Sequence, residues 1–425
     1  MLVAAARQQS RVASDLDRPL IPDAERLHRS IEQLAQVGAQ KDGSVCRRGF
    51  TKADSDGRQL VARWMTEAGL NVRVDPAGNL IGRWDGEDSD LPALVTGSHI
   101  DTVPTGGHFD GALGVLAGLE VVRTLQAEGR RLRHPLEVIA FADEESTMVG
   151  CKGMAGTASS DPAAYTTSNG EPIAINLERI GGHWPSLASA CRDDGAIAAF
   201  LELHVEQGSV LESRGDSIGV VEGIVGQRRF TIRIGGQANH AGTTPMEFRQ
   251  DALVTAAEVV LAIEALATRH PGDPVATVGR LQVWPNAANV VPGSVEMTVD
   301  LRDLSQRVLQ ELVDGLMLEL ERIGGRRQCS IQLEPQFEVA PTPADTLVIE
   351  AVSASAAALS LTQSRLPSRA SHDAQELGRR WPMGMIFVPS RGGLSHSASE
   401  YTSPEQCREG TAVLLEALQR LDRLL

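Results

Sequence analysis

Apolar residues fall into a repeating pattern in the first part of the chain. Residues 91–100 and 134–145 each contain a compact apolar run, and residues 111–129 between them carry small and apolar residues at helical spacing. A strand, a helix and a strand of these lengths predict a parallel crossover. Open α/β sheets place their ligand sites at the carboxyl ends of such strands. We therefore expect His99 and the acidic end of the second run to lie close together.

The pattern changes after about residue 213. Residues 228–237, 274–284 and 294–303 alternate apolar and polar side chains, which is typical of half-buried antiparallel strands. Residues 252–266 and 308–320 have the spacing of amphipathic helices. Together these segments predict an α+β insert with the order βαββαβ.

Beyond residue 332 we expect the apolar segments to return to the first sheet. They comprise residues 333–341, an alanine-rich helix at 346–359, an apolar strand at 383–389 and a final amphipathic helix at 403–425.

These patterns predict an α/β fold with two domains. The larger domain, residues 1–213 and 332–425, contains a mixed and mostly parallel sheet flanked by helices. The insert, residues 214–331, forms a smaller α+β lid domain. A chain of 425 residues is long enough to form both cores.

Charge and cysteine content narrow the partners and the compartment. The net charge of −15 disfavours nucleic acid and anionic membranes, which require a basic surface. No run of about 18 apolar residues could span a bilayer, and residues 1–18 lack the pattern of a secretory signal. The five cysteines are odd in number and include no CxxC pair, which favours reduced thiols. We expect a cytoplasmic protein that binds neither nucleic acid nor membranes.

The segment SHIDTVPTGGHFDG contains two histidines and two aspartates at the end of a predicted strand. Imidazole and carboxylate groups together suit zinc, manganese and related divalent ions. Asp110 is the candidate for bridging two ions, because a carboxylate between two cations moderates their repulsion. Asp101 is placed to accept the proton of the His99 nitrogen that does not bind metal. The alternative is a surface turn rich in glycine and aspartate.

Two adjacent glutamates follow the second apolar run, in the segment DEES. Neighbouring carboxylates repel each other unless a cation or a shared proton relieves the repulsion. One of Glu144 and Glu145 would then bind metal, and the other would act as general base toward water whose pKa the metal lowers. A solvated acidic loop is the alternative.

Two further histidines lie in predicted strand ends or loops. His204 stands in LHVEQG, and His396 stands in SHSASE within a glycine-rich region. For either histidine alone, a buried imidazole bonded to the backbone is the simpler interpretation. Their convergence with the two acidic segments in one domain favours a metal centre.

The sequence resembles the hydantoinase/carbamoylase amidases, which are relatives of the di-zinc aminoacylase-type peptidases. The resemblance rests on GSHIDTVPTGGHFDGALGVLAGLE, FADEES, LELHVEQGSVLE, GIVGQRRF, GGQANHAGTTPMEFRQDAL, NAANVVPGSVEMTVDLRD, SHDAQ and GGLSHSASEYTSPE, and it covers nearly the whole chain. It implies a catalytic domain like that of di-zinc exopeptidases, with an inserted lid and dimerisation domain.

The resemblance also implies a role for each site residue. One divalent ion would be held by Asp110, Glu145 and His396, and the other by His99, Asp110 and His204, with Glu144 as general base. His240 would stabilise the oxyanion, while Gln207, Asn289 and Arg302 would contact the substrate. Zinc is the default ion, and manganese, cobalt and nickel are the alternatives.

The segments that carry His240 and Arg302 also have simpler interpretations. NHAGTTP could be a polar turn that caps the following helix through Thr243 or Thr244. Arg302 could form a salt bridge at a strand edge, although its guanidinium is also suited to binding a substrate carboxylate with two hydrogen bonds.

The implied reaction is hydrolysis of a ureido or amide C–N bond in a small substrate that carries a carboxylate. N-carbamoyl-L-amino acids are the leading class, with allantoate and N-carbamoyl-β-alanine as alternatives. A dipeptidase or aminopeptidase is a further alternative. A metal-free binding or scaffold protein, the alternative from a different class, would be expected to lack at least one of the five ligands. The resemblance also implies a homodimer through the lid domain and leaves open whether His240 completes the partner's site.

One segment departs from the family pattern. The family usually has Gly-Ala-Gly before His-Asp-Ala, whereas this chain has Arg369, Ala370 and Ser371 before residues 372–374. The bulkier residues could narrow the pocket, or add a cation and a hydroxyl near the substrate. We therefore expect an altered specificity with every proposed metal ligand still in place.

Overall fold

The computed structural model describes residues 19–425, which divide into two compact units. Unit 1 comprises the described residues up to Glu222 together with residues 344–368 and 372–425, and unit 2 comprises residues 223–343 and 369–371. Residues 1–18, for which no secretory signal was predicted, lie outside the described part. None of the described helices is long and apolar enough to cross a membrane.

Unit 1 is built on a mixed sheet with the strand order β1-β2-β4-β3-β5-β15-β6-β13, and β14 pairs with β6. The strands are β1 (Asn71–Val74), β2 (Leu80–Trp84), β3 (Ala93–His99), β4 (Leu136–Phe141), β5 (Ile197–Val205), β6 (Ile218–Ile224), β13 (Thr342–Pro343), β14 (Gln363–Ser368) and β15 (Met383–Val388). The parallel pairs form the centre, where β3 lies between β4 and β5 and β15 lies beside β5. The predicted mixed sheet is confirmed, with antiparallel strands toward both margins.

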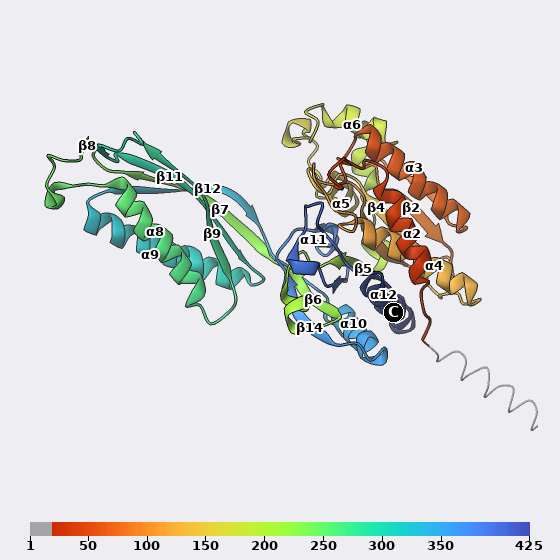
Figure 1. Ribbon diagram of the computed structural model, residues 1–425. Helices are drawn as coiled ribbons and strands as arrows, with labels where there is room; N and C mark the ends of the chain where they lie inside the picture. The colour runs from red at the N-terminus through yellow and green to blue at the C-terminus, as the bar shows by residue number, and fades with distance from the viewer. Residues whose placement is uncertain (1–18) are drawn as a thin grey trace, which may run out of the picture. The chain divides into compact units, whose positions relative to one another are not determined.

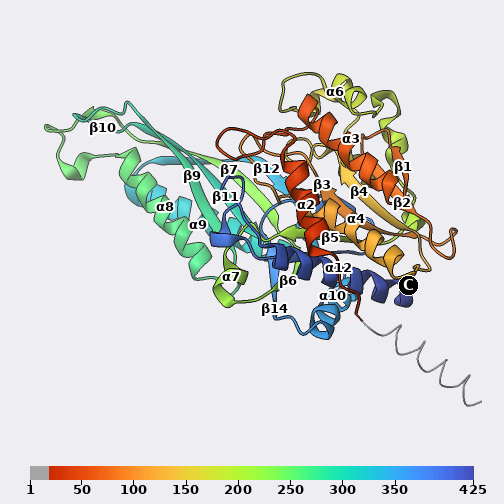
Figure 2. The same cartoon turned by 45° about the vertical axis from the view of Figure 1, so that its right-hand side comes forward.

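Helices flank this sheet, as predicted. The longer ones are α2 (Ala24–Ala35), α3 (Lys52–Glu67), α4 (Ala112–Ala127), α10 (Thr346–Ala358) and α12 (Pro404–Leu424). Helix α4 connects the parallel strands β3 and β4, and its apolar residues are almost all buried. Helices α2, α4 and α12 lie side by side in both ribbon views, and their apolar side chains share one core with the central strands (Figures 1 and 2).

Short helices and a long connection complete unit 1. The short helices are α5 (Val149–Ala155), α6 (Ile173–Arg179), α7 (Val210–Arg214) and α11 (Asp373–Leu377). Helices α5 and α6 belong to the connection from β4 to β5, and a small apolar cluster holds this connection together.

Unit 2 contains a four-stranded antiparallel sheet with the order β12-β7-β11-β9. Its elements are β7 (Gly226–Gly235), α8 (Ala252–Thr268), β9 (Val275–Trp284), β11 (Ser294–Asp303), α9 (Gln306–Arg327) and β12 (Ser330–Val339), with β8 (Asn239–His240) paired to β10 (Val290–Val291). Helices α8 and α9 pack side by side against one face of the sheet (Figure 1). The alternation in β11 explains this packing, because its odd-numbered side chains from Val295 to Leu301 are buried in the core of the unit.

One predicted segment belongs to the other sheet. We expected residues 333–341 to rejoin the first sheet, but most of this segment lies in β12, which pairs with β7. That expectation was wrong, because an alternating pattern predicts a strand without naming its neighbour. The insert was predicted at residues 214–331, whereas unit 2 begins at Gly223 and its main segment ends at Pro343. The difference arises because β6 pairs with β15 in the large sheet, whereas β12 joins the small one.

Candidate active site

The candidate metal ligands lie at the carboxyl ends of the central parallel strands. His99 is the last residue of β3, and His204 is the next to last residue of β5. Asp110 precedes Gly111, the residue that caps the start of α4, and Glu145 follows β4. His396 comes from the loop before α12. The sheet topology therefore gathers residues from distant parts of the sequence at one edge.

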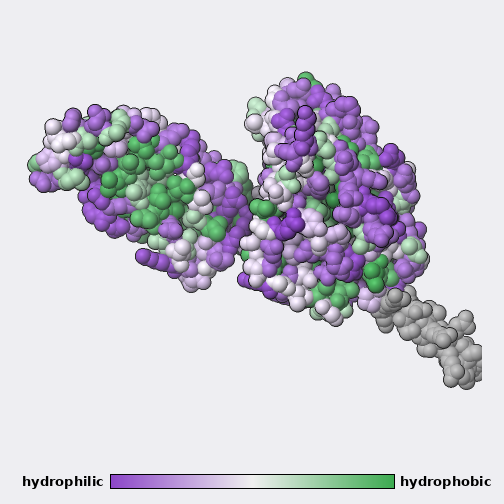
Figure 3. Space-filling model, viewed as in Figure 1, coloured by the Kyte–Doolittle hydropathy of each residue, from purple (hydrophilic) through white to green (hydrophobic). Residues whose placement is uncertain are grey.

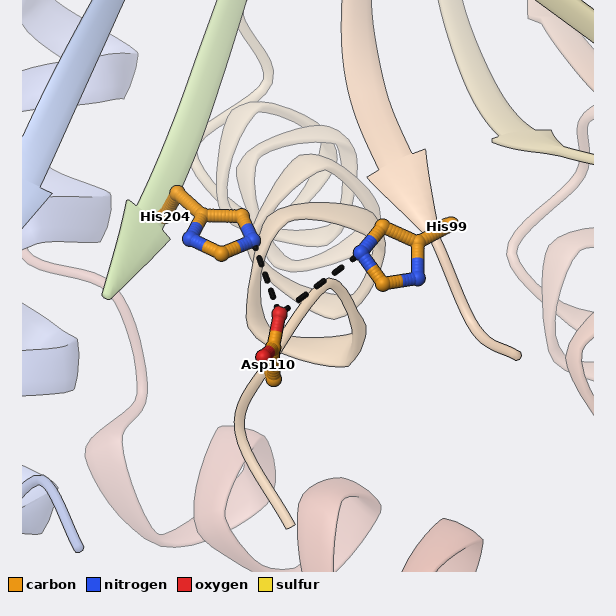
Figure 4. Close-up of side chains that lie close together, drawn as sticks. All are labelled: His99, Asp110 and His204. Carbon is orange, nitrogen blue, oxygen red and sulfur yellow. Dashed lines mark ion pairs between the residues drawn. The ribbon is translucent and has the colours of Figure 1, made fainter. Parts of the chain in front are cut away.

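The carboxylate of Asp110 lies between the rings of His99 and His204 (Figure 4). Its Oδ1 atom lies 3.6 Å from Nε2 of His99 and 3.1 Å from Nε2 of His204. Its Oδ2 atom lies 3.2 Å from Nε2 of His396, and that nitrogen is 3.5 Å from Oε1 of Glu145. Each of the sets His99, Asp110, His204 and Asp110, Glu145, His396 has its ligand atoms within 4.8 Å of one another.

The hydrogen bonds of His99 and His204 indicate which nitrogen of each buried imidazole ring carries the proton. Nδ1 of His204 is 2.8 Å from the carbonyl oxygen of Val205, so this nitrogen donates, and Nε2 accepts from the backbone N–H of Gly111. Nδ1 of His99 similarly donates to a carbonyl oxygen. In this state neither Nε2 atom carries a proton to donate to Oδ1 of Asp110, which is buried and has no hydrogen-bond partner among the described residues.

Three electron-rich atoms that face one another repel unless positive charge lies between them. A divalent cation supplies that charge, and the donor set of imidazole nitrogens and carboxylate oxygens fits zinc or a similar ion. Protonation is the other way to supply it. Burial lowers the pKa of His204, but the contact with Asp110 and the negative charges of Asp110 and Glu202 together outweigh burial, and the pKa lies above its usual value. The residues present therefore fit a cation site.

Glu144 is held close to this centre. Its Oε2 atom lies 3.7 Å from Nε2 of His99, and the carboxyl group is largely buried. Burial raises the pKa of Glu144 well above its usual value, and the negative charges of Glu145, Asp373 and Asp101 raise it further. Burial also raises the pKa of Glu145, to about 7. A carboxylate with a raised pKa accepts a proton from water more readily, which suits a general base.

Asp101 contacts the site in a different way from the one expected. We expected its carboxylate to accept the proton on Nδ1 of His99, but the carboxylate is 3.7 Å away and the backbone carbonyl oxygen of Asp101 is closer, at 2.9 Å. The carboxylate instead accepts the backbone N–H groups of Glu144 at 3.3 Å and of Glu145 at 3.2 Å. Asp101 thus orients both the imidazole and the two glutamates.

Glu400 is a site residue that the sequence analysis missed. Its Oε1 atom accepts the backbone N–H groups of Phe109 at 2.8 Å and Asp110 at 3.0 Å. Oγ of Ser395 lies 3.0 Å from the other carboxylate oxygen and 2.9 Å from Oδ2 of Asp110. Glu400 was part of the SHSASE segment, but the pattern gave no sign that it reaches the loop before α4.

A second layer of buried polar side chains lies behind His204. The ring of His372 packs edge-on against the ring of His204, with 4.5 Å between ring centres. Glu202 accepts the hydroxyl of Ser98 at 2.6 Å and the backbone N–H of Ala374 at 3.0 Å. These contacts join β3, β5 and the start of α11 beneath the candidate metal centre.

The residues expected to contact substrate fall in both units. In unit 1, Nε2 of Gln207 donates to Oδ2 of Asp110 at 2.9 Å, which places Gln207 against the metal-ligand group. In unit 2, His240 and Asn289 are exposed and lie together, because β8 pairs with β10 and the N–H of Ala241 donates to the carbonyl of Asn289. Arg302 lies near the other end of β11, where its Nε donates to Asp300 at 2.8 Å.

The chain is similar to known proteins of one hydrolase family. Residues 95–420 match the peptidase family M20/M25/M40. An N-carbamoyl-L-amino acid amidohydrolase from Geobacillus stearothermophilus is 40% identical over 402 residues, which cover 93% of this chain and 98% of that protein. An allantoate amidohydrolase from Bacillus subtilis is 36% identical over 397 residues, covering 92% and 96%. A solved amidase of the hydantoinase/carbamoylase family from Burkholderia multivorans has a TM-score of 0.89 and 37% identity, covering 95% of this chain and 99% of that one.

The fold and the matches define a hydrolase of a metal-dependent family. The chain belongs to the peptidase family M20/M25/M40 and, within it, to the hydantoinase/carbamoylase amidases.

Proposed function

We propose that this protein hydrolyses the ureido C–N bond of an N-carbamoyl-L-amino acid. The observation that carries the proposal is the convergence of His99, His204 and His396 on the carboxylate of Asp110, beside the raised-pKa carboxyl of Glu144. The names of the relatives support a ureido substrate. Allantoate and N-carbamoyl-β-alanine are the second candidates, because they also combine a ureido carbonyl with a carboxylate.

In this proposal two cations occupy the site. Asp110, Glu145 and His396 hold one, and His99, Asp110 and His204 hold the other, and these are two of the sets of ligand atoms that lie within mutual reach. Zinc is the first candidate, with manganese, cobalt and nickel as alternatives. When bound, such ions polarise a carbonyl group and lower the pKa of water.

The side chains of the protein carry the proton transfers. Glu144 takes a proton from the attacking water and returns it to the leaving nitrogen of the substrate. His240 donates a hydrogen bond to the oxygen on which negative charge develops. Arg302 binds the carboxylate, Asn289 and Gln207 contact the substrate, and Asp101 keeps Glu144 in position. Water and an N-carbamoyl amino acid give the amino acid and carbamate, which breaks down to carbon dioxide and ammonia.

We also propose a homodimer through unit 2, in which His240 and Asn289 act on the partner's substrate. Arg302 lies eight residues along β11 from Ser294, and β8 and β10 lie beyond Ser294. Eight residues of extended strand span about 27 Å. One copy of unit 2 therefore holds Arg302 and His240 too far apart to contact one small substrate together. A cytoplasmic location accords with five free cysteines among the described residues.

A substrate panel tests the proposed function. Protein stripped of metal with a chelator and reconstituted with zinc, manganese, cobalt or nickel is assayed with several N-carbamoyl-L-amino acids, allantoate, N-carbamoyl-β-alanine, N-acetyl amino acids and dipeptides. We expect hydrolysis of N-carbamoyl-L-amino acids by the reconstituted protein and none by the stripped protein. Full activity after complete metal removal, or activity confined to dipeptides, would reject the proposal.

The base is tested by Glu144→Gln, with metal content measured in parallel. We expect an unchanged metal content and a loss of kcat of about 1000-fold, since a general base contributes about 100- to 10,000-fold. Glu405→Gln is the matched control, because Glu405 is an exposed residue of α12 that pairs with Arg408. Full activity of Glu144→Gln would remove Glu144 from the mechanism.

A further inference from the structure

An open pocket rich in arginine lies on the face of the unit 2 sheet that α8 and α9 leave uncovered. The pocket has a volume of about 600 Å³ and is lined by residues of β7, β9 and β11 and by Arg369. Its charged lining residues are Arg229, Arg280, Arg302, Arg369 and Asp300. Four guanidinium groups face one carboxylate, so the pocket has an excess of positive charge that favours an anionic ligand.

Asp300, the acidic residue that lines the pocket, already binds two of the arginines. Oδ1 of Asp300 accepts from Nε of Arg302 at 2.8 Å, and Oδ2 accepts from Nη2 of Arg229 at 3.0 Å. Arg280 pairs at 2.7 Å with Glu296, which lies outside the pocket. Two guanidinium groups therefore share one carboxylate, and neutralisation within the lining is incomplete.

Arg369 interacts with Arg302 and with Asp273. Its backbone carbonyl accepts Nη1 of Arg302 at 2.7 Å. Its guanidinium donates to the carboxylate of Asp273 at 2.6 Å, but the Asp273 side chain is 95% exposed. An ion pair that open to water is weak, so a substrate carboxylate can replace Asp273 at small cost.

Arg369 lies close in the sequence to a residue that packs behind the candidate metal centre. Only Ala370 and Ser371 separate it from His372, whose ring contacts the ring of His204. Three residue steps of extended chain span at most about 11 Å.

We propose that Arg369 selects substrates with a second carboxylate, so that this enzyme acts on N-carbamoyl dicarboxylic amino acids such as N-carbamoyl-L-glutamate and N-carbamoyl-L-aspartate. The inference rests on the proposed function, in which Arg302 binds the α-carboxylate. Arg369 then pairs with the carboxylate at the end of the side chain, one or two carbons further along. Allantoate offers a neutral ureido group where these substrates offer the second charge, so the pocket disfavours it.

Two substrates of nearly equal shape test the inference. N-carbamoyl-L-glutamate and N-carbamoyl-L-glutamine differ at the side-chain end in charge and hardly in size. We expect the reconstituted enzyme to have a kcat/KM at least about tenfold higher for the glutamate compound, since a charge-assisted hydrogen bond replaces a neutral one. A preference for the glutamine compound, with clear hydrolysis of both, would overturn the inference and leave the proposed function intact.

Variants assign the preference to Arg369. Arg369→Gln and Arg369→Gly are expected to lower kcat/KM for the glutamate compound by about tenfold to a hundredfold, mainly through KM, and to change the glutamine compound by less than about threefold. Arg63→Gln is the matched control, because Arg63 is an exposed arginine on α3 paired with Glu67. Equal losses on both substrates would mean that Arg369 only supports the fold, and would overturn the inference.

A second variant avoids the risk of damaging the fold. Asp273→Asn removes the exposed carboxylate that competes for Arg369. We expect kcat/KM for the glutamate compound to rise by about twofold to threefold, in line with the small energy of an exposed ion pair, with no change for the glutamine compound. A fall for the glutamate compound alone would contradict the inference. Failure to hydrolyse any N-carbamoyl amino acid would reject both this inference and the proposed function.

Discussion

Backbone groups decide how the candidate ligands face one another. Two carbonyl oxygens fix the protons of His99 and His204 on Nδ1, and this leaves Nε2 of each ring directed at Asp110. Such contacts behind a ligand set its tautomer and orientation, and their loss typically weakens metal binding by about 10- to 100-fold. At the scale of single residues, the backbone around the site therefore sets the direction of the two candidate ligand nitrogens.

Gly111 allows the backbone to pass beside the ring of His99. Its φ is 64°, and a Cβ atom there would lie 2.5 Å from three atoms of the imidazole. Gly129 has nearly the same φ, 62°, but has open space around it. We expect Gly129→Ala to keep full activity at a cost of about 1–2 kcal/mol in stability, and Gly111→Ala to lose metal as well. Metal analysis after dialysis compares them, and equal metal content in both would contradict the steric argument.

Glu400 holds the loop that carries Asp110. In Glu400→Ala the buried N–H groups of Phe109 and Asp110 lose their acceptor, which should cost about 2–4 kcal/mol of folding free energy. We also expect metal affinity to fall by about 10- to 100-fold, measured by competition with a chromophoric chelator. Glu400→Gln retains one acceptor oxygen and should recover part of the affinity. Unchanged affinity in Glu400→Ala would show that the loop does not depend on this residue.

From the sequence we predicted that the candidate metal ligands lie together. The residues that hold those ligands in position were harder to predict. Their residue types and their positions at strand ends were enough to expect His99, His204 and the acidic segments together. Glu400 was missed because it acts on backbone N–H groups 290 and 291 residues away, and no local pattern records such a contact. The position of Asp101 differed because a carbonyl oxygen and a carboxylate of the same residue compete for one imidazole proton.

At the scale of elements, the pattern of apolar residues identified helices and strands more reliably than it identified which strands pair with each other. The crossover from β3 through α4 to β4 was predicted and is confirmed, because a short connection leaves one sterically favoured arrangement. Strand β12 was assigned to the wrong sheet. Its pairing with β7 depends on a contact between segments separated by the whole of α8 to α9, which local periodicity does not encode.

Helix α12 begins shortly after the loop of His396, and its start is well defined. Ser403 and Gln406 form a capping box in which each side chain accepts the other residue's backbone N–H. Ser403→Ala should cost about 1 kcal/mol and lower the melting temperature by about 1–2 °C. We expect activity to stay within about twofold, with Ser399→Ala as an exposed control. A large loss of activity would mean that the cap also orders the His396 loop.

At the scale of the whole molecule, the proposed dimer needs a surface on unit 2. Apolar surface gathers over α8 and α9 in the space-filling view (Figure 3). On α8 the exposed side chains include Leu253, Val254 and Leu261, and on β9 they include Leu281 and Trp284. Helix α8 packs beside β9, which is an edge strand of its sheet. An apolar helix face next to an unpaired strand edge is a surface that a second copy of the chain could cover.

Leu261→Glu tests this surface, because the Leu261 side chain is 63% exposed and a charge there disfavours apolar contact. We expect a monomer in analytical ultracentrifugation, with unchanged metal content. If His240 and Asn289 serve the partner's substrate, kcat/KM should also fall by more than about tenfold, since each monomer then lacks an oxyanion donor. Leu347→Glu, at an exposed leucine of α10 in unit 1, should leave the dimer and its activity intact. A Leu261→Glu monomer with full activity would exclude completion by the partner, and an unaltered dimer would place the interface elsewhere.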